Sequence, residues 1–217
     1  MSITLPIFPL NIVLFPGAPL PLRIFEPRYR KMLERCLRAD RRFGVVLIKN
    51  GPEVGGTAEP YDVGTVARIE NVRDEDGGAI PVFTRGEERF RIISLDRSGD
   101  YLVGDIELLS DKVDAAAGPA ADLARKAADE YIRLLLTIQG EWHRILELPT
   151  DPLKLSYFLG SVVLGLDGAV RQKILETDPV SSRLTLAARA ISEAATELQK
   201  TVMRAGPGRE RTVFGAN

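Results

Sequence analysis

Residues 19–33 read PLPLRIFEPRYRKML, and within them a predicted strand runs directly into a predicted helix. Leu20, Leu22 and Ile24 are two residues apart, which places them on one face of a strand. Pro27 suits the first helical position, because its fixed φ is already helical and its missing N–H is not needed there. The next apolar residues take helical spacing: Tyr29, Met32, Leu33, Cys36 and Leu37. We therefore expect a helix from about residue 27 to residue 39 that packs on the same core as the strand.

Short apolar segments bounded by turn residues fill the rest of the first half of the chain. Besides the strand at 20–24, strands are predicted at residues 7–8, 12–15, 43–49, 63–72, 79–84, 90–95 and 101–109. Turns are predicted at residues 74–78 (DEDGG) and at residues 85–88 (RGEE). Short strands at regular spacing with turns between them predict a curled antiparallel sheet or a small barrel.

The second half of the chain is predicted to be helical. Asp151 and Asp178 each precede a proline, which is the pattern of an N-cap followed by proline at the first helical position. The predicted helices cover residues 122–137, 151–166, 169–176 and 178–205. The sequence thus predicts an α+β protein with a β-barrel-like domain at 1–110, a linker at 111–121, a helical bundle at 122–204 and a flexible tail at 205–217.

Composition narrows the classes of function. The chain has 217 residues, a formal net charge of −1 and a single cysteine, so an intramolecular disulfide is impossible and a reducing cytoplasm is the expected location. The balanced charge gives no global attraction to nucleic acid or to an anionic membrane. Prolines interrupt the apolar N-terminal segment, so neither a signal peptide nor a membrane-spanning helix is expected. No cofactor or metal is predicted.

The start of the chain also carries a family resemblance. Pro21-Leu22-Arg23-Ile24-Phe25-Glu26-Pro27-Arg28-Tyr29, preceded by Phe8-Pro9-Leu10 and by Val13-Leu14-Phe15-Pro16-Gly17, resembles the N-terminal substrate-binding domain of the Lon protease family. Further similar segments extend the resemblance over about residues 4–203. The resemblance implies a distorted six-stranded β-barrel related to the PUA-like folds, with one helix packed on it, followed by helices. We expect a free-standing version of the domain, because no Gly-x-x-x-x-Gly-Lys-Ser/Thr segment and no Ser-Lys peptidase motif are present.

For the residues that could take part in catalysis, the sequence favours a structural role. Cys36 lies on the apolar stripe of the first helix, which indicates a packed thiol and leaves a reactive thiol or a Cys36–His143 pair as the alternative. Glu26 is expected to cap that helix and to pair with Arg23 or Arg28, and a hydrolase built on Glu26 or Cys36 ranks last. His143, the only histidine, is interpreted as a surface or capping residue, and Trp142 as a packing residue. No catalytic residue is assigned.

Binding of another molecule is therefore the expected function. Phe8, Phe15, Leu20 and Phe25 either line an apolar groove for unfolded segments or complete the barrel core, and an open strand edge could accept a peptide as an added strand. Five residues define the structural motif of this region: Arg23, Glu26, Pro27, Arg28 and Tyr29. As the resemblance implies, we predict a non-catalytic polypeptide-binding module, an adaptor for unfolded or degron-bearing clients with a separate ATP-dependent protease as a possible partner. The alternative is RNA binding through a local basic patch: Arg23, Arg28, Arg30, Lys31, Arg35 and Arg38.

Overall fold

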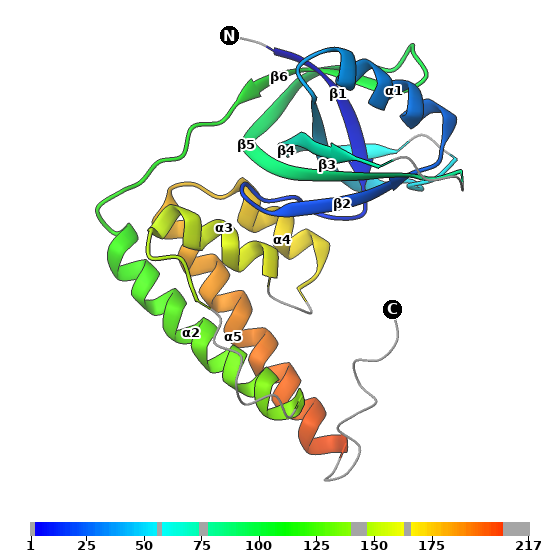
Figure 1. Cartoon of the computed structure of the whole chain (residues 1–217). Helices are drawn as coiled ribbons and strands as arrows, with labels where there is room; N and C mark the ends of the chain where they lie inside the picture. The colour runs from blue at the N-terminus through cyan, green and yellow to red at the C-terminus, as the bar shows by residue number, and fades with distance from the viewer. Residues whose placement is uncertain (1–2, 56–57, 74–77, 140–146, 163–165, 206–217) are drawn as a thin grey trace. The chain divides into compact units, whose positions relative to one another are not determined.

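The structure is a computed structural model that describes residues 3–55, 58–73, 78–139, 147–162 and 166–205. The predictions for the turn at 74–77, for Trp142 and His143, and for the tail beyond residue 205 lie outside these residues. Two compact units are present (Figure 1). The first unit comprises Met1–Asp111 together with Arg171–Glu176, and the second comprises Lys112–Val170 and Thr177–Asn217.

The first unit is a six-stranded sheet that closes into a near-barrel (Figure 1). Its strands are β1 (Ile3–Leu10), β2 (Pro19–Ile24), β3 (Arg42–Asn50), β4 (Glu59–Val72), β5 (Ile80–Asp96) and β6 (Leu102–Leu108), in the spatial order β2-β5-β4-β3-β1-β6. The second half of β5 also pairs with β6, which closes the ring and leaves β2 attached only to the first half of β5. The predicted α+β fold class is confirmed.

One strand pair departs from the predicted antiparallel sheet. β1 and β3 are parallel, with Ile7 opposite Gly44 and Leu10 opposite Leu47. Parallel neighbours need a long crossover connection, and here the chain between them contains β2 and the first helix. The predicted strand at residues 12–15 is not formed, because this segment is part of the crossover. It contributes instead the buried side chains of Leu14 and Phe15.

β5 is a single strand of 17 residues, so the turn predicted at 85–88 is wrong. Gly86 lies in its middle, opposite Ala67, next to a shift of register between β4 and β5. A Cβ atom on Gly86 would lie 2.3 Å from the carbonyl oxygen of Phe15. The backbone of Gly86 also exchanges hydrogen bonds with Gly17 and Ala18 at 2.8 and 2.9 Å. This glycine therefore permits a close backbone approach rather than a turn.

The first helix, α1 (Pro27–Arg38), packs on the barrel as predicted. Tyr29, Met32, Leu33 and Cys36 are buried in one cluster with residues of β1, β2, β3 and β4. Leu37, which the spacing also placed on this stripe, is exposed. The helix ends without a glycine, because Arg41 adopts the left-handed conformation (φ 61°) and donates its backbone N–H to the Cys36 carbonyl.

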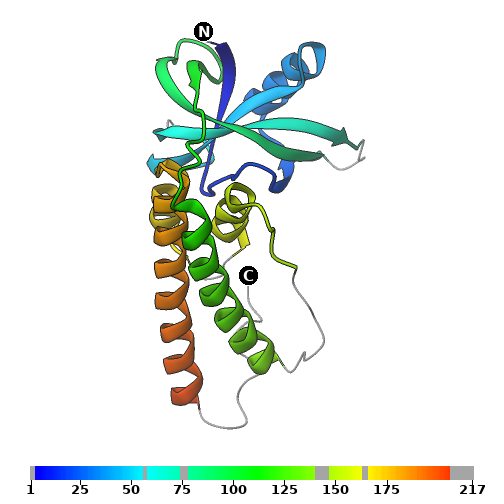
Figure 2. The same ribbon diagram turned by 90° about the vertical axis from the view of Figure 1, so that its left-hand side faces the viewer.

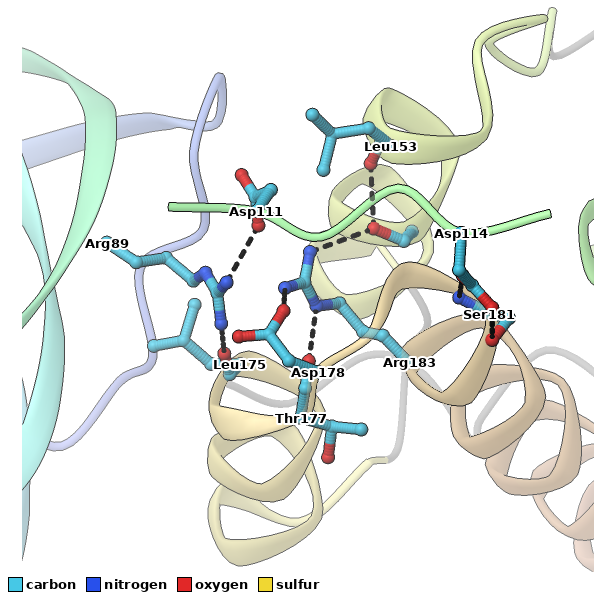
Figure 3. Close-up of polar contacts among 10 residues, drawn as sticks. Arg89, Asp111, Asp114, Leu153, Leu175, Thr177, Asp178, Ser181 and Arg183 are labelled. Carbon is cyan, nitrogen blue, oxygen red and sulfur yellow. Dashed lines mark hydrogen bonds and ion pairs between the residues drawn. The ribbon is translucent and has the colours of Figure 1, made fainter. Parts of the chain in front are cut away.

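The last part of α4 (Gly168–Glu176) belongs to the first unit. The Gln172 side chain is buried and donates to the Val63 carbonyl of β4 at 2.9 Å. The Arg89 guanidinium is buried as well, and it donates to the Leu175 carbonyl at 2.8 Å and to the Asp111 carboxylate at 2.7 Å (Figure 3). Residues far apart in sequence thus complete one unit.

The second unit consists of helices. They are α2 (Ala117–Gln139), α3 (Pro152–Val162), the start of α4, and α5 (Val180–Ala205). α2 and α5 lie side by side and run in the same direction, as both views show (Figures 1 and 2). Among the described residues, no helix is long and apolar enough to cross a membrane.

The helix starts in the second unit differ from the predictions in two places. α2 begins at Ala117, inside the predicted linker, because Pro119 falls in the first turn, where its missing N–H is not needed. Asp151 caps α3 as predicted, accepting from the Lys154 N–H at 2.8 Å. The cap predicted for Asp178 is wrong: the carboxylate of Asp114 accepts instead from the N–H and the hydroxyl of Ser181.

Candidate functional site

The four predicted binding residues separate into three buried side chains and one exposed side chain. Phe8, Phe15 and Leu20 are buried, and Phe8 and Leu20 belong to the core cluster that packs against α1. Phe25 follows β2 directly, and its side chain is 53% exposed. It lies at the junction between β2 and α1, where the chain changes from strand to helix. Phe25 is therefore the predicted residue that a ligand can reach.

Polar contacts fix the backbone of this junction. Glu26 occupies the N-cap position of α1, although its carboxylate does not accept from the N–H groups of the helix. The carboxylate instead pairs with the Arg28 guanidinium at 3.0 Å, as predicted, and accepts from the Gly55 N–H at 3.3 Å. Arg28 also donates to the Glu53 carbonyl at 3.4 Å and stacks over the ring of Tyr29, 4.5 Å from its centroid. These contacts hold the loop at 51–55 against the start of α1.

Two further exposed apolar residues lie on segments tied to this junction. Val54 lies in the loop between Glu53 and Gly55, and its side chain is 55% exposed. Ile12 is 44% exposed and follows Asn11, whose N–H donates to the Glu53 carboxylate at 3.3 Å. We call Ile12, Phe25 and Val54 the Phe25 surface. Ile12 was expected in a strand and Val54 in an ordinary loop, so the sequence offered no signal for either residue.

The two candidate catalytic groups named from the sequence, Glu26 and Cys36, are engaged or buried in the structure. The carboxylate of Glu26 is committed to Arg28 and Gly55. Cys36 is buried in the core, as predicted, and burial together with the nearby Asp40 raises the pKa of its thiol from 9.0 to about 11. A thiol with this pKa is almost entirely protonated at neutral pH and is a poor nucleophile. Within the described ranges, no cluster of three or more His, Cys, Asp or Glu residues could hold a metal ion.

The open edge of β2 is poorly suited to strand addition. Proline cannot donate to β5, so Pro19 and Pro21 must direct their backbone nitrogens toward the open edge. The alternate residue Leu20 faces β5, where its carbonyl accepts from the Thr84 hydroxyl at 2.9 Å. An added strand would therefore find no N–H donor at either proline. The edge is protected in the way that many natural edge strands are.

The predicted basic patch, whose residues lie on β2 and α1, is partly neutralised. Arg28 pairs with Glu26, Lys31 with Asp100 at 2.6 Å, and Arg38 with Glu34 at 3.7 Å. Within the described part of the chain, at least three of the six cations in the predicted patch have a carboxylate partner. The predicted patch therefore mixes cations with carboxylates and is not the continuous positive surface that a phosphate backbone favours.

The fold defines a two-unit α+β protein, a near-barrel with one packed helix joined to a helical unit, and the comparisons identify its family. Residues 4–193 match the ATP-dependent protease La (LON) substrate-binding domain, and the chain belongs to this family.

Known relatives agree with this assignment. The chain is 28% identical over 189 residues to Lon protease 2 of Myxococcus xanthus and 29% identical over 187 residues to the Lon protease of Anaeromyxobacter dehalogenans. Each alignment covers 84% of this chain and 22% of the relative, so the chain spans about a fifth of the length of these relatives. A crystal structure of a Lon N-terminal domain protein from Xanthomonas campestris is similar with a TM-score of 0.62 and 28% identity, covering 84% of this chain and 95% of the other. The N-terminal domain of the Mycobacterium avium complex Lon protease, at 19% identity and a TM-score of 0.67, covers 88% of this chain and 98% of the other and shares the fold.

Proposed function

We propose that the chain binds unfolded polypeptide segments through the Phe25 surface and does so without catalysis. The observation that carries this proposal is the exposure of three large apolar side chains on segments that hydrogen bonds hold together. Exposed apolar side chains on a fixed backbone bind apolar segments of a client without first having to be ordered. Membership of a substrate-binding family supports the same ligand class.

In this proposal the chain is an adaptor. It holds unfolded or degron-bearing clients, and an ATP-dependent protease is its partner. The buried Cys36 and the engaged Glu26 support a non-catalytic role, because neither is available as a nucleophile or a general base. RNA is the weaker alternative, because the net charge is −1 and carboxylates lie among the cations of the predicted basic patch.

The test replaces Phe25 and measures binding of a labelled unfolded polypeptide by fluorescence anisotropy. Burying a Phe side chain completely stabilises a complex by roughly 1.5–3 kcal/mol, and about half of that is available from a ring that is 53% exposed. About half of this range is ~0.8–1.5 kcal/mol, so Phe25→Asp should weaken binding by roughly four- to twelvefold. The matched control is Leu123→Asp in α2, which removes an apolar side chain of similar exposure, 64%, from the second unit.

Unchanged affinity of the Phe25→Asp variant, or an equal loss in the Leu123→Asp control, would overturn the proposal. Far-UV circular dichroism of both variants confirms that the fold is retained. Because both side chains are exposed, neither substitution should change the spectrum.

A further inference from the structure

The second unit contains an apolar groove that the Phe25 surface does not involve. It encloses about 400 Å³ and is lined by residues from α2, α4, α5 and the segment before α4: Tyr131, Leu166, Asp167, Val170, Ala190, Glu193, Ala194, Glu197, Leu198 and Thr201. Its volume lies within the roughly 300–1,000 Å³ that ligand sites occupy. Most of its surface is contributed by apolar side chains. The groove is therefore large enough for one or two large apolar side chains of a ligand.

The groove follows one face of α5. Ala190, Ala194, Leu198 and Thr201 are spaced by three or four residues, which places them in one row along the helix. Eleven residues at 1.5 Å each give the row a length of roughly 16 Å. An extended peptide advances about 3.3 Å per residue, so about five residues of a ligand would span the row. A short segment of polypeptide matches this length better than a compact small molecule does.

The charged residues that line the rim of the groove are acidic in the described part of the chain. They are Asp167, Glu193 and Glu197, and no lysine or arginine is among the described lining residues. The ion pairs of Glu193 with Arg189 and of Glu197 with Lys200 lie on exposed helix surface. Exposed pairs of this kind contribute little and exchange readily, so an arriving cation can replace them. The charge of the rim therefore selects a basic ligand.

We propose that this groove binds a polypeptide segment in which large apolar side chains are flanked by arginine or lysine. The apolar side chains occupy the space above Ala190, Ala194 and Val170, and the flanking cations pair with the rim carboxylates. This site adds charge selectivity that the Phe25 surface lacks. It depends only on residues of the second unit, so its failure and the failure of the Phe25 surface can be told apart.

The test measures fluorescence anisotropy of a labelled twelve-residue peptide, in which two leucines are flanked by arginines, titrated with the full chain. A second peptide carries glutamate at every arginine position. We expect saturable binding of the basic peptide and at least tenfold weaker binding of the acidic one, because its charges repel the rim. Equal binding of the two peptides would overturn the proposal.

Variants locate the binding. Glu193→Lys combined with Glu197→Lys should weaken binding of the basic peptide by about tenfold. This is the magnitude expected when two exposed charge contacts are reversed in sign. The control reverses two exposed carboxylates of α2 outside the groove, Asp129→Lys with Glu130→Lys, and should retain nearly the original affinity. Ala194→Phe fills the groove without changing its charge and should abolish binding.

Two outcomes of the variant series would overturn the proposal. One is an equal loss in the rim variant and in the α2 control, because a general effect of net charge would then explain the binding. The other is binding that appears only after residues 206–217 are removed, because the occupant would then be the chain's own C-terminal segment. Phe25→Asp should leave binding of the basic peptide unchanged, which separates this groove from the Phe25 surface.

Discussion

The buried guanidinium of Arg89 yields a prediction about the stability of the first unit. Its side chain is fully buried, and it holds the Asp111 carboxylate at 2.7 Å and the Leu175 carbonyl at 2.8 Å (Figure 3). Asp111 is 21% exposed, so water reaches the carboxylate but not the guanidinium. Removing one partner of a buried ion pair is costly mainly because the remaining charge stays buried. The two possible truncations are therefore unequal.

Asp111→Ala should destabilise the fold more than Arg89→Met. In Asp111→Ala the buried cation loses its carboxylate, which costs on the order of 3 kcal/mol. In Arg89→Met the remaining carboxylate is partly hydrated and a chain of similar length fills the space, so the cost is about 2 kcal/mol, mainly from the lost hydrogen bonds. The double variant should resemble Arg89→Met, because no buried charge remains in either.

Urea unfolding followed by far-UV circular dichroism measures these differences through the shift of the midpoint. The conservative variant Asp111→Asn separates charge from size, since it keeps the shape of the side chain and removes its charge. An Asp111→Ala variant as stable as the original chain would show that the buried guanidinium does not depend on this carboxylate. A larger loss of stability in Arg89→Met than in Asp111→Ala would show the same, because an unpaired buried cation would then carry no energetic penalty.

Three further predictions concern single residues. The Cys36 thiol, with a pKa of about 11 instead of 9.0, should resist alkylation at pH 8 until urea unfolds the chain. The thiol has a higher pKa in the folded chain than in the unfolded chain, so deprotonation at high pH favours unfolding. The free energy of unfolding should therefore be unaffected by this group below pH 9 and should fall by roughly 2–3 kcal/mol by pH 11. A Cys36→Ala variant should not show this fall. Gly86→Ala should cost about 1–3 kcal/mol, measured by urea unfolding, because the new methyl group meets the Phe15 carbonyl. Asp114→Ala should lower the melting temperature at pH 7. Hydrogen bonds from Ser181 lower the pKa of Asp114 from its usual 3.8, so the carboxylate is protonated in the folded chain only in more acidic solution. The difference in melting temperature between the variant and the original chain should therefore disappear as the pH falls below 3.8.

The sequence predicted the parts of the fold that local chemistry determines. Pro27 and the stripe from Tyr29 to Cys36 predicted α1 and its buried face, and the alternation around Leu20 predicted β2. The parallel β1–β3 pair was missed, because strand direction depends on which strands meet and not on their composition. Gly86 was misread as a turn residue because a glycine needed for close backbone approach has the same local signature.

The candidate site was predicted only in part. Four apolar side chains in a proline-rich region are equally compatible with a core and with a groove, and only their packing shows that Phe25 is exposed while Phe8, Phe15 and Leu20 are not. Val54 joins the Phe25 surface through a bond between Glu26 and Gly55, residues 29 positions apart. Pairings at this separation leave no periodic signal in the sequence.

Titration of the chain into a labelled unfolded polypeptide and into a labelled RNA oligomer, each at low and high salt, distinguishes polypeptide binding from RNA binding. Binding to the polypeptide should be saturable and should persist at high salt, because contacts with the Phe25 surface are apolar and salt screens only charges. Binding to RNA alone, falling steeply as salt rises, would contradict this expectation and would establish nucleic acid as the ligand.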